Sequence, residues 1–178
     1  GSPRYSLRAR NNEFAKLDVL EQGIKEAHER NKKFFLTVNT LPHNSKLKTF
    51  VSDMEPLIAM KPDALIMADP GLIMTVREKW PEMPIHLSVQ ANTTNYWGVK
   101  FWQNIGVERI ILSRELSMEE IAEIRQECPD IELEVFIHGA LCIAYSGRCL
   151  LSGYFNHRDP NQGTCTNSCR WDYKIGRA

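Results

Sequence analysis

Five short apolar runs, separated by stretches of helical periodicity, constrain the fold of this chain more than any other sequence feature. Each run holds about five consecutive apolar residues, which is typical of strands buried on both faces of a sheet. The predicted strands are residues 33–40, 63–70, 84–91, 108–116 and 132–140. The predicted helices are residues 17–31, 46–60, 71–80, 96–106 and 117–128. Ser117 and Glu120 form a capping box that opens the last of these helices.

This alternation of strands and helices predicts parallel βα units. Residues 3–8 are a candidate tail of a further strand. We expect residues 1–141 to form an incomplete (β/α)8 TIM-like barrel, an α/β fold, with the first strand and the C-terminal part of the barrel outside the chain. An open doubly wound sheet is the alternative, but no G-x-G-x-x-G motif follows any predicted strand.

The composition of the 178 residues, 43% hydrophobic and 25% charged, is that of a folded globular protein. The formal net charge is zero, which excludes a general polycationic attraction to nucleic acids or lipids but leaves a local basic patch open. No apolar run approaches the roughly 18 residues of a membrane helix, and the charged residues 1–14 do not resemble an export signal. We therefore expect a cytoplasmic protein with no membrane contact, and the sequence leaves its oligomeric state open.

Polar side chains follow the predicted strands, at the rim where barrels place their chemistry. They are Asn39, Asp69, Ser88, Gln90, Ser113, Arg114, Glu115 and His138. Any one of them is more readily explained as a helix cap, but five strand ends together favour a shared pocket. Arg114 is a candidate for binding a carboxylate or phosphate, and His138 and Glu115 are candidates for proton transfer. Asn39, Asp69 and Gln90 are candidate substrate contacts.

Four of the five cysteines, Cys142, Cys149, Cys165 and Cys169, cluster in the last quarter of the chain. In a cytosolic protein such clustering favours metal binding or redox chemistry over disulfides. The C-x6-C-x15-C-x3-C spacing lacks the tight pairs of zinc sites and suits an iron–sulfur cluster better. Zinc, two disulfides and inert thiols stay open as alternatives. Cys128, at a predicted helix end, is interpreted as a structural thiol.

Residues 142–178 are predicted to form a cluster-binding segment that packs on the barrel. This segment also contains Arg148, His157, Arg158 and Arg170. These cations are either solvated loop residues or groups that tune a cluster and hold an anionic substrate. In the second interpretation Arg148 and Arg158 are substrate-binding residues.

Residues 134–153, EVFIHGALCIAYSGRCLLSG, resemble the signature of the collagenase-like peptidase U-32 family. The matching positions are Glu134, Phe136, Gly139 to Cys142, Gly147, Cys149 and Ser152. Further segments look like the bacterial branch of this family that is concerned with tRNA hydroxylation. They are RYSLRARNNEF, PDALIMADPGLI, IHLSVQAN, ILSRELS and NHRDPNQGTCTNSCRW. The resemblance covers essentially the whole chain.

The resemblance implies an enzyme that hydroxylates the 5-position of the wobble uridine in tRNA, with prephenate as a required co-substrate, toward 5-carboxymethoxyuridine. Sister branches act in rRNA cytidine hydroxylation and in oxygen-independent ubiquinone hydroxylation, and the latter hold a [4Fe–4S] cluster on four cysteines. By this resemblance Cys142, Cys149 and Cys165 match cluster ligands. Cys169 fits some branches, whereas in others the fourth ligand lies beyond this chain. Arg114 would then hold a carboxylate of the small co-substrate, with His138 and Glu115 moving protons.

Two other functions remain as alternatives. The first is the peptidase activity in the family's name. The chain contains neither H-E-x-x-H nor G-x-S-x-G, and a Cys–His hydrolase built on His138 would need only one of the four clustered thiols. The second is a non-catalytic tRNA-binding or scaffold protein, whose binding would depend on salt without any change in modification.

Overall fold

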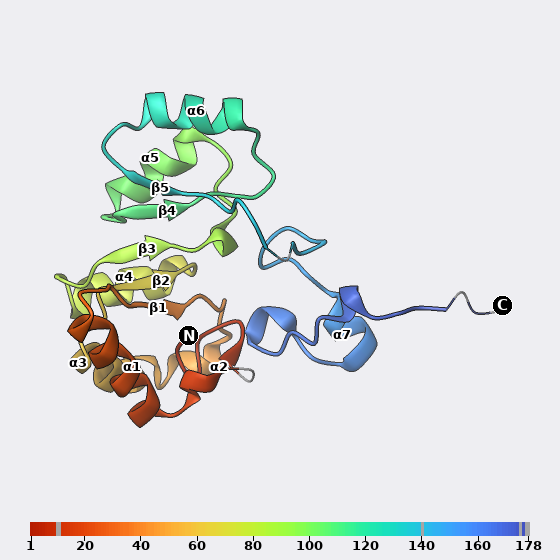
Figure 1. Ribbon diagram of the computed structural model, residues 1–178, viewed down its shortest axis with the longest axis horizontal. Helices are drawn as coiled ribbons and strands as arrows, with labels where there is room; N and C mark the ends of the chain where they lie inside the picture. Colours follow the sequence, from red (N-terminus) through yellow and green to blue (C-terminus); the bar gives the residue numbers. More distant parts are fainter. Residues whose placement is uncertain (10–11, 140, 175, 177–178) are drawn as a thin grey trace.

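The computed structural model describes residues 1–9, 12–139, 141–174 and 176. A five-stranded sheet forms its centre, with strands in the order β1-β2-β3-β4-β5 and every neighbouring pair parallel (Figure 1). The strands are β1 (Phe35–Val38), β2 (Ala64–Met67), β3 (Ile85–Leu87), β4 (Arg109–Ile111) and β5 (Glu132–Glu134). The longer helices are α1 (Leu17–Glu29), α3 (Phe50–Ala59), α4 (Pro70–Lys79), α5 (Tyr96–Asn104) and α6 (Met118–Glu127). The prediction of an α/β fold with parallel βα units is confirmed.

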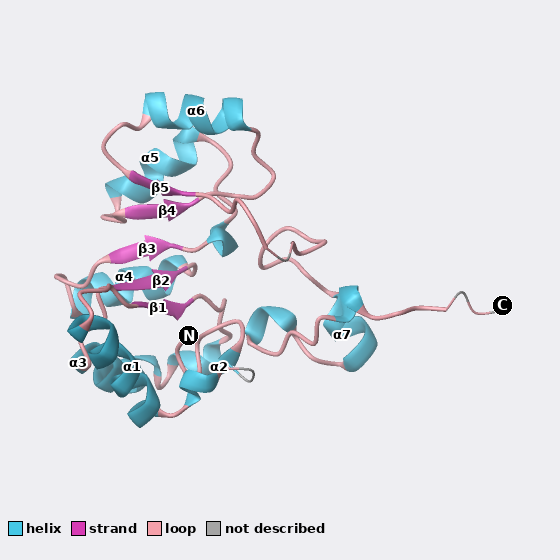
Figure 2. Cartoon of the chain, in the orientation of Figure 1, coloured by secondary structure: helices cyan, strands magenta, loops and turns pink. Residues whose placement is uncertain are grey.

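Short helices complete the chain. They are η2 (Glu13–Ala15), α2 (Asn44–Leu47), η3 (Val89–Ala91), α7 (Leu151–Asn156), η4 (Pro160–Gln162) and η5 (Ser168–Arg170). Because parallel crossovers are almost always right-handed, connections between consecutive neighbours place their helices on the same face of the sheet. In Figure 2 the strands run side by side from β1 to β5, and their carboxyl ends point toward α7.

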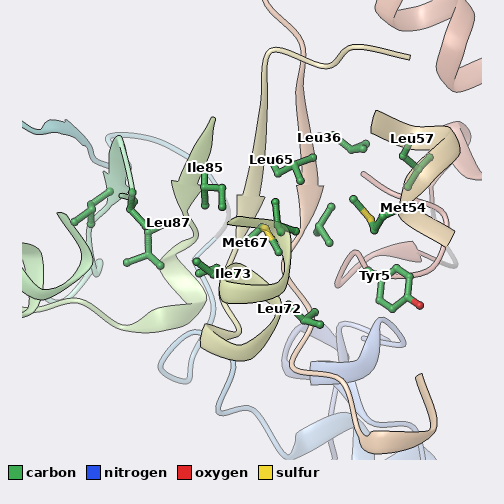
Figure 3. Close-up of a cluster of buried hydrophobic side chains, with 14 of the residues drawn as sticks. Tyr5, Leu36, Met54, Leu57, Leu65, Met67, Leu72, Ile73, Ile85 and Leu87 are labelled. Carbon is green, nitrogen blue, oxygen red and sulfur yellow. The ribbon is translucent and has the colours of Figure 1, made fainter. Parts of the chain in front are cut away.

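The hydrophobic core lies between the sheet and these helices. Alternate strand residues point toward the helices, because successive side chains of a strand lie on opposite faces. The strand residues of the core include Leu36, Val38, Leu65, Met67, Ile85, Leu87 and Ile110, and helix residues such as Met54, Leu57, Leu72 and Ile73 pack against them (Figure 3). Full burial of each large side chain contributes about 1.5–3 kcal/mol, so this packing is the main source of stability.

The opposite face of the sheet, called the polar face below, carries charged and aromatic side chains beside the apolar Ala64, Ile66 and Ile111. The Arg109 guanidinium lies 2.7 Å from the Glu132 carboxylate and 3.5 Å from that of Glu134. It also lies 5.1 Å from the centre of the Phe35 ring, which packs edge-on against the ring of His86 at 4.6 Å. One face of the sheet is therefore held by apolar packing, and the other carries charged and aromatic groups.

The N-terminal residues run beside β1. The Ser2 amide donates to the Thr37 carbonyl at 2.9 Å, and the Thr40 amide donates to the Tyr5 carbonyl at 3.0 Å. Residues 3–8 form turns rather than the regular strand tail that the sequence suggested. Tyr5 is fully buried, and its hydroxyl donates to Asp53 at 2.7 Å. Burial and this hydrogen bond raise the pKa of Tyr5 to about 12, which keeps the phenol neutral.

The prediction of a long, buried strand at residues 132–140 was wrong. β5 ends at Glu134, Ile137 is 93% exposed, and residue 140 lies outside the described part of the chain. The physical reason is that β5 pairs with β4 alone, so in the described residues nothing covers its other edge or the apolar run that follows. The sheet is thus open at β1 and β5, and closure into an eight-stranded barrel stays a prediction.

The segment from Cys142 to Lys174, called the cysteine segment below, packs at the carboxyl ends of the strands (Figure 1). The Lys46 ammonium donates to the Gln162 carbonyl at 3.2 Å, and the Gln162 amide donates to the Leu41 carbonyl. The expected division into residues 1–141 and 142–178 includes residues 175, 177 and 178, which are outside the described residues. Among the residues that the structure describes, no helix has both the length and the apolar character needed to cross a membrane.

Candidate functional site

A cavity of about 530 Å³ lies between the carboxyl ends of the strands and the cysteine segment. The sheet side of this cavity is lined by side chains on or just after the strands: Thr37, Asn39, Ile66, Ser88, Gln90, Ile111 and Glu134. The other side is lined by the cysteine segment, and Arg8 and Arg170 also contribute to the wall. Open parallel α/β sheets bind ligands at this edge, so the cavity is the candidate functional site.

All four clustered cysteines, Cys142, Cys149, Cys165 and Cys169, line this one cavity. All five cysteines of the chain are free thiols, which excludes the two-disulfide alternative in this structure. Four free thiols beside glycine-rich turns are a donor set that fits an iron–sulfur cluster in chemistry. The sulfur atoms do not form a ligand sphere as they lie, since no three His, Cys, Asp or Glu residues of the described chain are grouped to hold a metal ion.

Cys128 lies apart from this site. It is buried against the core at the C-terminal end of α6, and its thiol contacts the Tyr96 carbonyl at 3.7 Å. Burial raises the pKa of the Cys128 thiol, which keeps it protonated and unreactive. The interpretation of Cys128 as a structural thiol is confirmed.

Two of the predicted substrate contacts, Asn39 and Gln90, lie in the cavity wall. The Asn39 side chain accepts from the Leu7 amide at 3.2 Å and donates to the Ser88 hydroxyl at 3.2 Å. Gln90 is different, because its buried Oε1 has no hydrogen-bond partner within the described residues. A buried acceptor without a partner is costly, but this oxygen lies against Gly147, where an added Cβ would come within 2.8 Å of it, so a ligand reaches it only after the side chain turns.

Arg114 does not point into the cavity, and the expectation that it binds a substrate carboxylate finds no support in its position. Its side chain is only 11% exposed, and it donates to the Cys142 carbonyl at 3.0 Å and the Ala144 carbonyl at 2.9 Å. A third bond reaches the Ser146 hydroxyl at 3.3 Å. The forked guanidinium therefore fixes the backbone that precedes Cys149, which suits arginine because its donors are rigidly arranged.

Neither candidate for proton transfer lies in the cavity wall. Glu115 accepts a hydrogen bond from the Ser113 hydroxyl and lies 3.9 Å from the Arg114 guanidinium. His138 is exposed in the segment after β5. The short β5 explains this position, since the chain leaves the sheet before it reaches His138.

Asp69 behaves as a helix cap and not as part of the cavity wall. Its carboxylate accepts from the Leu72 amide at 2.9 Å, and Pro70 opens α4 directly after it. Asp, followed by Pro at the first helical position, is a favoured way to begin a helix. At this strand end the polar residue is therefore a helix cap, which is the simpler of the two explanations that the sequence allowed.

Arg148 and Arg158 are exposed on the cysteine segment and line two other hollows, not the main cavity. Arg148 lies in a hollow with Asn92 and Tyr145. Arg158 lies in a second hollow together with Cys165 and Trp171, so one of the four clustered cysteines forms part of its wall.

Asn92 is a positioning residue that sequence reasoning missed. Its backbone is left-handed at φ 52°, and its side-chain amide donates to the Ser146 carbonyl at 2.7 Å and the Gln90 carbonyl at 3.0 Å. Asn tolerates the left-handed region better than most residues, and this preference is the only feature of the sequence that could have indicated the turn at Asn92. Gly147, which directly follows Ser146, has φ +72°, and a Cβ there would lie 2.8 Å from Gln90 Oε1. Arg8, a cation of the cavity wall, was missed as well.

A second hollow, of about 400 Å³, lies at the opposite, amino ends of the strands. His86 lines it together with Lys33, Arg109 and Glu132. Burial, and then the neighbouring Arg109 charge, lowers the pKa of His86 to about 4. His86 is therefore neutral at physiological pH and belongs to the polar face of the sheet, far along the strands from the clustered thiols.

Comparison with known proteins agrees with this description. The chain is 69% identical over 175 residues to "tRNA hydroxylation protein P" of Haemophilus influenzae, and 67% identical over 175 residues to the protein of the same name in Escherichia coli. Each match covers 98% of this chain and 38% of the relative, so the chain spans well under half the length of these proteins. A solved structure, that of the U32 peptidase Mk0906, superposes with a TM-score of 0.56 at 17% identity, over 65% of this chain and 50% of the other. This likeness concerns the fold.

The model of the family described as "Peptidase family U32" matches residues 1–178. The motif around Cys142 and Cys149, the parallel sheet and the relatives all agree with that match. The chain therefore belongs to peptidase family U32.

Proposed function

We propose that this chain is part of an enzyme that hydroxylates tRNA, at the 5-position of the wobble uridine, with prephenate as co-substrate. The names of the relatives support tRNA hydroxylation in general. The observation that carries the proposal is that four clustered thiols line one cavity at the carboxyl ends of parallel strands. A hydrolase needs one thiol there, whereas redox chemistry on a cluster needs several.

Cys142, Cys149, Cys165 and Cys169 would hold a [4Fe–4S] cluster, which supplies electron transfer when it is bound. Cysteine ligands must be deprotonated to bind metal, and binding energy contributes to the ordering of the site. The support for this assignment is the shared cavity and the free thiols. The turn at Gly147, with its positive φ, brings the chain from Cys142 to Cys149 around the edge of the cavity.

The side chains on the sheet side would recognise the target base. A uracil edge offers one N–H donor between two carbonyl acceptors, which matches the acceptor and donors of an amide. Gln90, whose buried Oε1 lies without a partner beside Gly147, would turn its side-chain amide into the cavity, accept the uracil N–H and donate to a carbonyl. The base must leave its stack to reach this position, which costs least in a single-stranded loop such as the anticodon loop.

A small carboxylate co-substrate needs cations in the same cavity. Arg114 is engaged with the loop backbone and does not supply such a cation. Among the described residues, the arginines that line the cavity are Arg8 and Arg170. Guanidinium binds carboxylate in a bidentate manner, so these two residues would hold prephenate. In the whole protein we propose a completed (β/α)8 barrel, working in the cytoplasm, with the cysteine segment as the cluster-binding part.

The test is mass spectrometry of tRNA nucleosides from a strain that lacks the full-length protein and any redundant pathway. We expect the 5-hydroxyuridine derivatives to disappear, to return with the wild-type protein, and to stay absent with Cys149→Ala. Cys128→Ala is the matched control, because it removes a thiol outside the cavity, and it should restore modification. Intact 5-hydroxyuridine derivatives in the deletion strain would remove the proposed function.

A second measurement concerns the cofactor. Full-length protein purified without air should contain iron and acid-labile sulfide, and Cys149→Ala should lower both while Cys128→Ala leaves them unchanged. Protein without iron and sulfide would contradict the cluster and leave the RNA substrate to be tested separately. Proteolysis has less support, since His138 is not among the described residues that line the cavity with the four thiols.

A further inference from the structure

The cysteine segment exposes a group of aromatic side chains on its outer surface. Tyr154 is 79% exposed, Tyr173 53%, Trp171 47% and Phe155 44%. Tyr154 and Phe155 lie edge to face with ring centres 5.1 Å apart, and Phe155 and Tyr173 lie 5.1 Å apart at 31°. Single exposed apolar residues are ordinary, but rings that gather on one surface mark an interaction site.

A hollow of about 440 Å³ has one of these four residues, Trp171, in its wall. Its wall consists of Asn156, Arg158, Cys165, Thr166 and Trp171. Cys165 also lines the main cavity, so this thiol separates the two spaces. A flat ring, a guanidinium and polar groups around a space of this size are suited to stack on and hydrogen-bond a nucleobase.

The charge of the segment differs from that of the rest of the chain. Residues 142–174 contain four basic and two acidic side chains, whereas the whole chain has a net charge of zero. Arg158 and Arg170 are exposed close to the aromatic residues in the sequence. Exposed rings interleaved with cations are complementary to a polyanion with flat, unpaired bases, which is the chemistry of single-stranded RNA.

We propose that this surface binds the unpaired nucleotides next to the target uridine, with one base stacked on Trp171 beside Cys165. The uridine itself enters the main cavity on the other side of Cys165, so a single-stranded RNA loop spans both spaces. Tyr154, Phe155 and Tyr173 offer further faces for stacking, and Arg158 contacts phosphate. This inference rests on the proposed function, because it names where that substrate is held.

The experiment measures binding of the full-length protein to an RNA hairpin with the anticodon-loop sequence. Trp171→Ala should weaken binding about 5- to 100-fold, because one stacked base is lost, and Trp171→Phe should retain most of the affinity. Trp97→Ala is the control, since Trp97 is an even more exposed ring, at 69%, and lies on α5 outside the cysteine segment; it should leave binding unchanged. A continuous RNA duplex should bind weakly to every variant.

The role of Arg158 is tested by salt. Arg158→Gln should reduce the slope of log affinity against log salt concentration by about 0.7, the value of one phosphate contact on a single strand. The control is Arg30→Gln. Arg30 is an exposed arginine that pairs with Glu26 at the end of α1, outside the cysteine segment, and its substitution should leave the slope unchanged.

The outcomes separate this inference from the proposed function. If Trp171→Ala and Tyr154→Ala bind the hairpin as tightly as the wild-type protein, the proposal that this surface binds RNA is wrong, even if the wild-type protein hydroxylates tRNA. A fall in thermal stability without a change in affinity also overturns it, because another part of the protein would then cover the rings. Ring-dependent binding without any tRNA hydroxylation would instead support the surface and remove the proposed function.

Discussion

The sheet with its helices and the cysteine segment are held together by different forces. In the sheet region the buried side chains are large and apolar, such as Leu36, Leu65 and Leu87. In the cysteine segment the buried side chains are small and polar, such as Ser152 and Ser168. Burial of apolar area fixes the first region, whereas directed hydrogen bonds fix the second.

The network inside the cysteine segment shows what such bonds achieve. The Ser152 hydroxyl accepts from the Thr166 amide at 3.1 Å, and the Asn156 amide donates to Thr166 and Ser168, each at 3.0 Å. Each bond contributes only about 0.5–1.5 kcal/mol net, so the segment opens locally more readily than the sheet. The thiols thus sit on the less stable part of the molecule, where a bound cofactor would add most to local order.

The largest expected effect breaks the sheet region. Leu65 in β2, an interior strand of the sheet, is fully buried, so Leu65→Ala removes packing and leaves a cavity. We expect the free energy of unfolding to fall by about 2–5 kcal/mol in denaturant titration. Leu150→Ala, an exposed leucine of the cysteine segment, is the control and should change stability by less than about 0.5 kcal/mol. Equal losses at the two positions would contradict the difference between the regions.

The second prediction concerns pH and the polar face of the sheet. The pKa of His86 is about 4 in the folded protein, against about 6.5 for an unperturbed histidine. Between these values the unfolded state binds a proton that the folded state excludes, so stability is complete above pH 6.5 and declines as the pH falls toward 4, by at most about 3 kcal/mol. His86→Gln should flatten this dependence, and His43→Gln should not. If wild type and His86→Gln lose stability in the same way as the pH falls, the assignment of this pH dependence to His86 is wrong.

The same difference explains what the sequence could predict. The apolar runs at β1 to β4 are dictated by burial, so the strands, their parallel order and the helices between them were predictable. The capping box at Ser117 and Glu120 was predictable because it depends on residues three apart. The clustering of thiols in the sequence predicted a shared metal or redox site; the four cysteines line one cavity, and the cofactor stays a prediction.

The polar partners at the strand ends were less predictable, because they depend on the path of a distant loop. Arg114 meets Cys142 and Ala144 only because the chain returns to β4 after β5, and no local pattern shows this return. Asp69 could equally cap a helix or line a pocket until the bond to Leu72 decides between them. The position of His138 was predicted wrongly because residues 132–140 were taken as one strand buried on both faces. In the structure β5 is the last strand of the described sheet and ends at Glu134.

The third prediction loosens the cysteine segment without unfolding the sheet. Arg114→Ala leaves the carbonyls of Cys142 and Ala144 without their donor, at a local cost of about 1–3 kcal/mol. In the protein without cofactor we expect amide exchange at residues 142–147 to become about 10- to 100-fold faster, while alkylation of the buried Cys128 stays as slow as in wild type. Arg114→Lys should fall between, because a single ammonium cannot bridge both carbonyls in the same way.

The control for this change is Arg30→Ala, which removes an exposed arginine from α1 and should alter neither rate. Amide exchange at residues 142–147 reports on the cysteine segment, alkylation of the buried Cys128 reports on the sheet region, and mass spectrometry measures both. If Arg114→Ala speeds alkylation of Cys128 by the same factor as amide exchange at residues 142–147, the residue supports the whole fold, and its role as a local clamp is wrong.

The smallest expected effect lies at the turn between Cys142 and Cys149. Gly147→Ala forces a side chain into the left-handed region at φ +72°, which costs about 1–2 kcal/mol, and Gln90 must also shift because the new Cβ meets its Oε1. Gly153→Ala in α7 is the matched control, since its backbone is helical and the nearest atom is 3.9 Å away. We expect Gly147→Ala alone to speed amide exchange of residues 142–147, by about 5- to 30-fold, while the midpoint of global unfolding stays near that of wild type. Because the cysteine segment is fixed by directed bonds, a strain of this size should be felt there first; a global destabilisation equal to the local one would mean that the two regions unfold as a single unit.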